Sequence, residues 1–233
     1  MLKTETLETT NKIFRAVFDR DNHFSLDKLK QKFAFDIMLP TEVKDYSTGE
    51  TTYTAVPNAK KFMTDKNTYD HEWMRPRRPL HSLSEVLAAW DEINDMTTDR
   101  VYHSENVHAS DPIYNSINVY GSTNCAKSKN IIYCDNAFES NFCLACCRSG
   151  NLNFCIRVDD SSFCSNSYSV ICCNKITNSF FIQDANTLNE CMFCSHLEQH
   201  EYCIANMQFE KDEYFFLKNQ IIDWILSSNG VQK

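Results

Sequence analysis

The sequence predicts a mainly β protein. We expect a narrow β-solenoid of about twelve residues per turn and roughly eight turns, an irregular α+β N-terminal region and a C-terminal capping helix. Every third residue from Val101 to Cys203 is Cys, Ser, Val, Ile, Leu or Ala, with one His, and none is charged, Asn, Gln or Pro. This period is neither the two residues of a strand nor the 3.6 of a helix. It is typical of a solenoid, because a short side and its corner take about three residues and one of them points inward.

A second period sets the length of one turn. Outward residues twelve apart form an apolar ladder, whereas the outward residues midway between them are mixed. The pattern favours a twelve-residue turn, with an eighteen-residue, three-sided turn as the alternative. At ~4.8 Å per turn the rod is then on the order of 40 Å long. If no helix covers the ladder, we expect it to bind a partner. The expected interface consists of the ladder and one C-terminal tryptophan: Tyr120, Ile132, Leu144, Ile156, Tyr168, Phe180, Met192 and Trp224.

The composition divides the chain into three parts: an N-terminal arm or helical region over 1–100, the repeat over 101–208 and an amphipathic helix over 209–233. In the first part, a helix is expected over 4–18 and strands over Lys32–Val43 and Thr51–Val56. Ser82 and Glu85 form a capping box that opens a helix to about Met96. The segment Trp73–Pro79 is extended and cationic, and is expected to be a solvated linker or a docking segment for an acidic partner.

The C-terminal helix is expected over Lys211–Ser228, ended by Asn229 and Gly230. A solenoid has open strand edges at both ends, and these must be blocked. The simplest arrangement places this helix over the C-terminal end and Leu83–Met96 over the other. The alternative is that one of them lies along the ladder.

The net charge and the apolar segments of the sequence limit the classes of function that we expect. The net charge of −8 with scattered Lys and Arg does not favour nucleic-acid binding. The first residues lack the apolar core of a signal peptide, and no run approaches the length of a membrane span, so no membrane role is expected. The expected location is the cytoplasm, or a virion if the gene belongs to a phage.

Ten of the twelve cysteines lie on the inward period, where Ser and Ala alternate with them. They behave as small buried fillers, so reduced thiols are expected rather than disulfides. Cys147 and Cys172 lie off this period and are the candidates for a reactive thiol.

One group of residues has zinc-like spacing: Cys191, Cys194, His196 and His200. Packing already explains three of them, since only His196 is off the inward period. A structural zinc ion is therefore an alternative, and no other cofactor is expected.

A carbohydrate site is a further alternative. Asp160 and Asp184 share one outward column two turns apart, flanked by Asp135 and Asp159, and the ladder supplies aromatic side chains. Solenoid enzymes of this class have wider turns and long loops that build a cleft, which a twelve-residue turn lacks.

The segment from Tyr102 to Tyr214 resembles Cys/Asn/Ser-rich hexapeptide-repeat proteins of large bacteriophages and small-genome bacteria. Those proteins close on a segment similar to Leu-x-Asn-x-x-Tyr-Cys-Ile-x-Asn-Lys-Gln, followed by an acidic helix. Here Gln199 replaces the first Asn and Met207 replaces the Lys, within Leu197-Glu198-Gln199-His200-Glu201-Tyr202-Cys203-Ile204-Ala205-Asn206-Met207-Gln208. The resemblance covers about half the chain and implies a β-solenoid and, for phage members, a virion component.

Together these features predict a non-enzymatic structural or assembly protein. Its partners would be other protein subunits, or further copies of itself, bound through the ladder and the N-terminal arm. A metal- or redox-responsive binding protein is the first alternative, and a carbohydrate-binding or carbohydrate-cleaving solenoid is the second.

Overall fold

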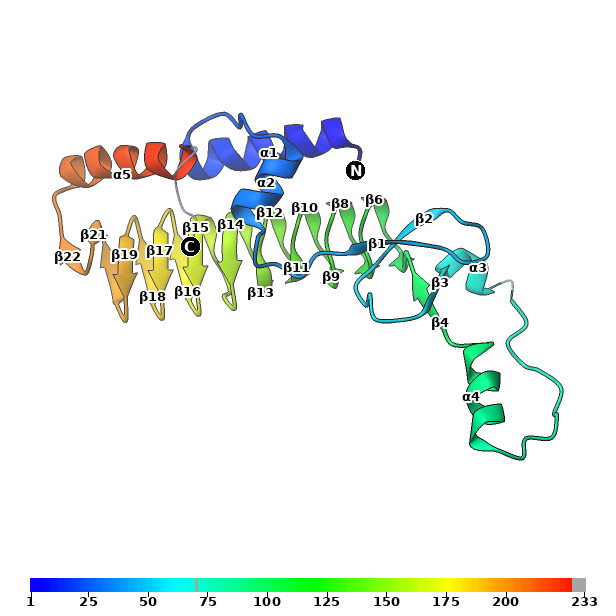
Figure 1. Cartoon of the computed structure of the whole chain (residues 1–233). Coiled ribbons are helices and arrows are strands. Elements are labelled where there is room, and N and C mark those ends of the chain that lie inside the picture. Colours follow the sequence, from blue (N-terminus) through cyan, green and yellow to red (C-terminus); the bar gives the residue numbers. More distant parts are fainter. Residues whose placement is uncertain (70, 228–233) are drawn as a thin grey trace.

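The computed structural model describes residues 1–69 and 71–227. Its centre is a β-solenoid of about nine coils with about twelve residues per coil (Figure 1). The parallel strands pair at a spacing of twelve residues, as in Ile131 with Cys143 and Cys143 with Cys155. The twelve-residue turn is therefore confirmed and the eighteen-residue alternative is wrong.

The strands are short, as a four-sided coil requires. Two of them, β14 and β15, are longer because they run through a corner without a break. The solenoid strands are β5 (Val101–Tyr102), β6 (Glu105–His108), β7 (Ile113–Tyr114), β8 (Ile117–Tyr120), β9 (Cys125–Ala126), β10 (Lys129–Ile132), β11 (Asp135–Phe138), β12 (Asn141–Leu144), β13 (Cys147–Gly150), β14 (Asn153–Asp159), β15 (Ser165–Ile171), β16 (Asn174–Thr177), β17 (Phe180–Gln183), β18 (Asn186–Asn189), β19 (Met192–Ser195), β20 (Glu198–Glu201), β21 (Cys203–Ile204) and β22 (Met207–Gln208).

The inward positions form the interior. Every third residue from Ser110 to Cys194 is buried, and the cysteines, valines, isoleucines and leucines among them form one continuous apolar cluster. The side chains fill this narrow interior, as close packing requires. The inward assignment made from the sequence is confirmed for these residues. In the end coils, His200 is exposed and four other inward positions are half-buried: Val101, Ser104, Val107 and Leu197.

The inward serines also have a polar role that their size does not reveal. Ser122 donates its hydroxyl proton to the carbonyl of Tyr120 at 3.0 Å and accepts the N–H of Cys134, twelve residues on, at 3.0 Å. Ser116 and Ser128 repeat the same pair of bonds. Because a buried peptide group without a partner is costly, the serines satisfy groups that the corners leave unpaired.

The corners have a left-handed backbone. Two residues separate successive inward positions, and the second of them has a positive φ through almost the whole repeat, from His103 to Ala205. Asn tolerates this conformation best after Gly, and many corners hold Asn. At Gly121 a Cβ atom would lie 2.7 Å from the ring of Tyr133, so this corner needs glycine for space as well as conformation.

Three helices cover one side of the solenoid (Figure 1). They are α1 (Lys3–Phe18), α2 (Leu26–Phe33) and α5 (Lys211–Leu226). The helices predicted over 4–18 and from Lys211 are confirmed. The predicted stop at Asn229 and Gly230 lies outside the described residues. The strand predicted over Lys32–Val43 is wrong in its first half, because α2 ends at Phe33 and only β1 (Thr41–Lys44) is extended.

The remaining N-terminal elements gather at the first coils (Figure 1). β1 pairs antiparallel with β2 (Thr51–Thr54), and β3 (Lys61–Thr64) pairs parallel with β4 (Asp95–Thr98). Between β3 and β4 the chain forms α3 (Asp65–Tyr69) and then α4 (Leu83–Asp91). This helix ends before the predicted Met96, which belongs to β4. Among the described residues, no helix has the length and apolar character that crossing a membrane requires.

Candidate functional site

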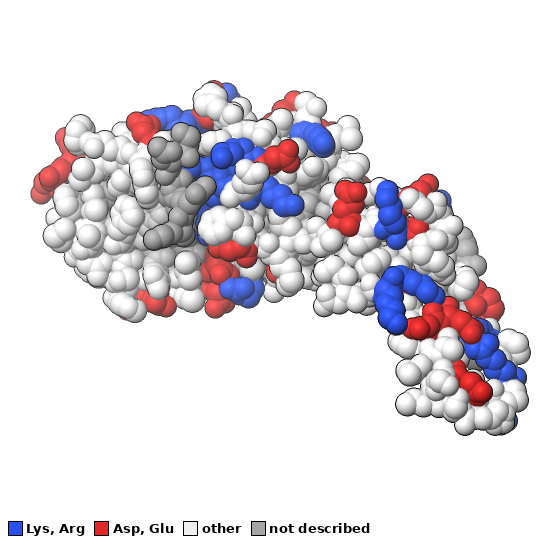
Figure 2. Space-filling view, viewed as in Figure 1, with Lys and Arg blue, Asp and Glu red and all other residues white. Residues whose placement is uncertain are grey.

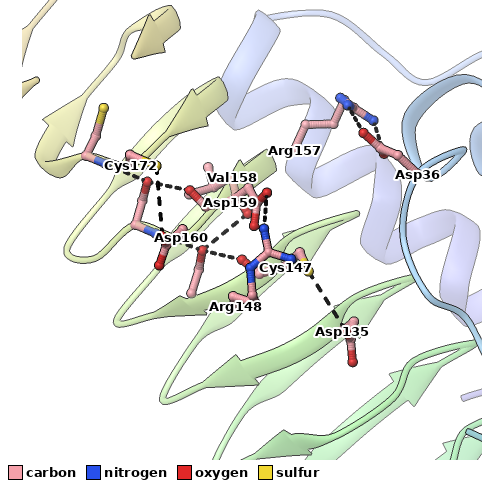
Figure 3. Close-up of polar contacts among 12 residues, drawn as sticks. Asp36, Asp135, Cys147, Arg148, Arg157, Val158, Asp159, Asp160 and Cys172 are labelled. Carbon is pink, nitrogen blue, oxygen red and sulfur yellow. Dashed lines mark hydrogen bonds and ion pairs between the residues drawn. The ribbon is translucent and has the colours of Figure 1, made fainter. Parts of the chain in front are cut away.

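A polar cluster surrounds Cys147 on one side of the solenoid (Figure 3). The strand register stacks Asp135, Cys147 and Asp159 in successive coils. The thiol Sγ lies 3.9 Å from Asp135 Oδ2, and Arg148 Nη1 donates to it at 3.5 Å. Arg148 also pairs with Asp159 at 2.6 Å. The stacked residues are twelve apart in the sequence, so the cluster can be found only once the twelve-residue register is known.

The cluster does not activate the thiol. Burial, followed by the carboxylates of Asp135 and Asp159, raises the pKa of Cys147 to about 11, although Arg148 acts in the opposite direction. A thiol attacks as the thiolate, which is scarce at neutral pH when the pKa is this high. The expectation that Cys147 is a reactive cysteine therefore gains no support from its surroundings, since the thiol is also buried.

Beside this cluster, Arg157 attaches α2 to the solenoid. Its guanidinium makes two bonds to the Asp36 carboxylate, at 2.8 and 2.7 Å (Figure 3). It also donates to the carbonyl of Phe33 at 2.6 Å. Only 17% of the Arg157 side chain is exposed. The cavity between these groups is about 80 Å³, which is small for a substrate. The geometry indicates a structural connection.

Cys172 is the exposed thiol of the chain. It lies on a corner column between Asp160 and Asp184. Its Sγ is 3.9 Å from Asp160 Oδ2 (Figure 3). Partial desolvation and the two neighbouring carboxylates raise the pKa of Cys172 above its ordinary value. The other eleven cysteines are buried, and none of the twelve forms a disulfide.

We expect a thiol-specific aromatic disulfide reagent to modify about one of the twelve thiols of the folded protein. The rate should increase with pH beyond the ordinary thiol pKa of 9.0, because Cys172 ionises later than a free cysteine. Mass spectrometry identifies the modified residue, and Cys172→Ser should abolish the reaction while leaving eleven thiols reactive in denaturant. Rapid modification of a second thiol in the native state would contradict this picture.

The structure does not assemble the proposed zinc ligands. Cys191 and Cys194 point into the interior, where their thiols contact the carbonyls of Asn189 and Met192 at 3.4 and 3.2 Å. His196 and His200 are exposed. Within the described ranges, no group of three or more His, Cys, Asp or Glu side chains is arranged to hold a metal ion. The zinc spacing in the sequence comes from the inward period.

The apolar ladder is covered by the protein's own helices. Ile132, Leu144, Ile156, Tyr168, Phe180 and Met192 are at most 1% exposed and belong to one cluster with α1, α2 and α5. Tyr120 is half-buried against Tyr133, and Trp224 is 46% exposed beside Phe181. The prediction that the ladder is an exposed interface is therefore wrong, because three amphipathic helices of the same chain take the place of a partner. The alternative in which a terminal helix lies along the ladder is the observed one.

The carbohydrate alternative loses its aromatic platform for the same reason. Tyr168 and Phe180 contact Phe18 of α1 with ring centroids 5.5 and 5.8 Å away, so no sugar can stack on them. Asp160 and Asp184 do share an exposed column, with Cys172 between them. The groove beside them is shallow and does not enclose a ligand.

One apolar surface that remains open is on the arm formed by residues 71–94. Every residue from His71 to Ala88 is exposed, and α4 buries none of its side chains. Its stripe has the spacing of a buried helix face, yet Leu83, Val86, Leu87 and Trp90 are 72%, 47%, 53% and 53% exposed. The arm projects from the end of the solenoid (Figure 1). The expectation that α4 covers the solenoid end is wrong.

Comparison with protein-family models, curated proteins and solved structures gives no match for this chain. A function for this chain is therefore inferred from its geometry. Of the surfaces described, the α4 stripe departs most from an ordinary monomer, because such stripes are normally buried.

Proposed function

We propose that this chain is a non-enzymatic structural protein that joins other protein subunits in a larger assembly. The observation that carries the proposal is the exposed apolar stripe of α4. A helix of this kind in a monomer covers a core, and here the described chain offers it none. A groove on another subunit, in which α4 lies as an amphipathic helix, supplies the missing core.

The arm is held in a definite shape for this purpose. Ser82 caps α4 by accepting the N–H of Glu85 at 3.3 Å. Arg75 and Arg78 fold the linker back onto Glu92, and Arg75 also donates to the carbonyl of Ala89 at 2.9 Å. These ion pairs occupy the polar side of the arm and leave its apolar stripe free.

Charge favours a protein groove over an anionic surface. Residues 71–94 carry four carboxylates and three arginines, and two of the arginines are paired with Glu92. Figure 2 shows charges of both signs together along the arm. A membrane-surface or nucleic-acid-binding helix would need a clear excess of positive charge.

The covered rod fits the same role. With its interior filled and one side covered by helices, the solenoid is a stiff spacer between α4 and the far end of the molecule. The resemblance of Tyr102–Tyr214 to repeat proteins of large bacteriophages supports a virion as the assembly, with the chain as a capsid- or tail-associated component. The thiol and metal alternatives gain no support from the geometry around Cys147 or Cys191.

The test is a double substitution, Leu83→Glu with Leu87→Glu. Since neither side chain packs on the rest of the chain, the free energy of unfolding should change by no more than about 0.5 kcal/mol each. Incorporation into the native assembly, followed by gradient sedimentation, should be lost. The matched control is Phe216→Glu on α5, where the phenylalanine is 67% exposed. Normal incorporation of the double variant would overturn the proposal.

A further inference from the structure

The C-terminal end of the solenoid has an open strand edge. β20 pairs on one side with β18, and its four residues, Glu198 to Glu201, are all exposed. The C-terminal helix does not cover this end. Instead, α5 runs back along the side of the solenoid (Figure 1), so the sequence-based expectation of an end cap is wrong.

The rest of the last coil is closed. β22 turns back antiparallel on β21, and the Asn206 side chain replaces a further strand by bonding both the N–H and the carbonyl of Ser195. Gln208 Nε2 donates to the carbonyl of Glu201 at 2.9 Å. Within the described part of the chain, the edge that stays open is therefore the segment from Glu198 to His200.

Two polar ladders end in a carboxylate at this edge. Asn186 Nδ2 donates to Glu198 Oε1 at 3.2 Å, and Asn189 Nδ2 donates to Glu201 Oε1 at 3.0 Å. Each glutamate thus receives a hydrogen bond from the preceding coil and faces outward from the last one. A cation placed one coil further along would continue both ladders. The chain uses this arrangement itself, because Lys127 pairs with Glu139 twelve residues later at 3.4 Å.

The surface beside β20 has the same sign of charge. A shallow groove runs to this edge, lined by Asp160, Asp184, His196 and Glu198 together with small and amide side chains, and neither Lys nor Arg lines it. Carboxylates along a groove attract cationic side chains and repel anionic ones.

We propose that β20 binds an extended basic segment of a partner protein as an added parallel strand. The solenoid register fixes the pattern. The first and fourth residues are Lys or Arg over Glu198 and Glu201, the second is Asn or Gly for the left-handed corner, and the third is apolar over His200. This site is separate from the α4 arm and stands independently of the proposed function.

A second copy of the chain is a poor occupant of the same edge. An antiparallel pair of two β20 strands would place Glu198 of one copy opposite Glu201 of the other. Like charges directly opposite each other destabilise a strand pair. A parallel pairing with β6 of another copy, which in its own chain pairs with β8, would place Glu105 over Glu198, again with like charges facing each other.

The probe is a capped, fluorescently labelled peptide, Thr-Ser-Lys-Asn-Ile-Lys-Asn-Ser, titrated into the full chain at low salt. Anisotropy gives the affinity, and amide shifts of Glu198 to Glu201 in NMR spectra give the location. We expect Glu198→Gln with Glu201→Gln to weaken binding about tenfold, since two ion pairs are lost. The control variant Glu105→Gln, an exposed glutamate at the opposite end, should bind normally.

A peptide of the same composition with adjacent lysines tests the register, and a peptide with Pro in place of Ile tests the backbone bond. Both should bind more weakly. The proposal is overturned if the parent peptide does not bind, if the adjacent-lysine peptide binds as tightly, or if the double glutamine variant keeps full affinity. Dimers in light scattering that Glu198→Lys disperses would also overturn it, in favour of a second copy.

Discussion

Replacing Phe18 with alanine should lower the free energy of unfolding by about 3–5 kcal/mol. Phe18 is fully buried at the end of α1, and its ring contacts Tyr168 and Phe180 of the ladder with centroids 5.5 and 5.8 Å away. The substitution leaves a cavity where the helix meets the solenoid, and the rigid coils cannot move to fill it. Chemical denaturation monitored by circular dichroism measures the loss.

The matched control is Phe216→Ala on α5. This phenylalanine is 67% exposed, so its removal should change the free energy of unfolding by no more than about 0.5 kcal/mol. Equal effects of the two substitutions would show that α1 does not lie on the ladder as described.

The second large effect is expected at Asp45, in the turn after β1. Its carboxylate is fully buried and accepts bonds from the N–H groups of Ser47 and Thr64 at 2.8 Å each, and from Asn67 Nδ2 at 2.9 Å. Asp45→Ala leaves buried donors without partners. Bonds to a charged group contribute about 1.5–3 kcal/mol each and are not additive, so the variant should lose about 3 kcal/mol or more.

The effect of Asp45 should depend on pH in one direction. Burial alone would raise the pKa of Asp45, but the hydrogen bonds from Ser47, Thr64 and Asn67 outweigh it and hold the pKa well below its ordinary value of 3.8. A depressed pKa stabilises the fold above the unfolded-state value, and this contribution is lost as the pH falls through the folded-state value. The difference between wild type and Asp45→Ala should therefore be smaller at about pH 3 than at about pH 7. A difference that does not change with pH would contradict this account.

The solenoid could be predicted from the sequence because its constraint is local and repeated. Every third residue points inward and must be small or apolar, so the pattern from Val101 to Cys203 predicts the coil directly. The twelve-residue period of the ladder gave the number of sides. The size of the inward side chains does not explain why serine is so frequent. The explanation is the hydrogen bonds between residues twelve apart, as between Ser122 and Cys134.

The placement of the helices could not be predicted, because an apolar stripe does not identify its partner. α5 and α4 have similar stripes, yet Ile225 is buried against the ladder while Leu83 is 72% exposed. The choice depends on the path of the chain and on the length of the loops. For the same reason, the sequence identified the ladder as apolar and could not show that α1 covers it.

At the corners, the strand register also overrides the backbone preference of individual residues. Asn at a corner is easily recognised, but Phe142, Phe154 and Phe181 adopt the same positive φ because the register requires a corner there. Phe142 and Phe154 offset part of that strain by stacking, with ring centroids 4.5 Å apart. The open edge at β20 was missed because the sequence places a helix after the repeat without showing its direction.

The most direct test of the assembly role is the mass of the native particle that contains this chain. Light scattering of the endogenous material, beside the purified chain of 27.1 kDa, gives that mass. We expect a particle far heavier than one chain, with this chain in fixed stoichiometry. The chain should be lost from the particle when Leu83 and Leu87 are replaced by glutamate. A native species of 27.1 kDa, unchanged by these substitutions, would contradict it.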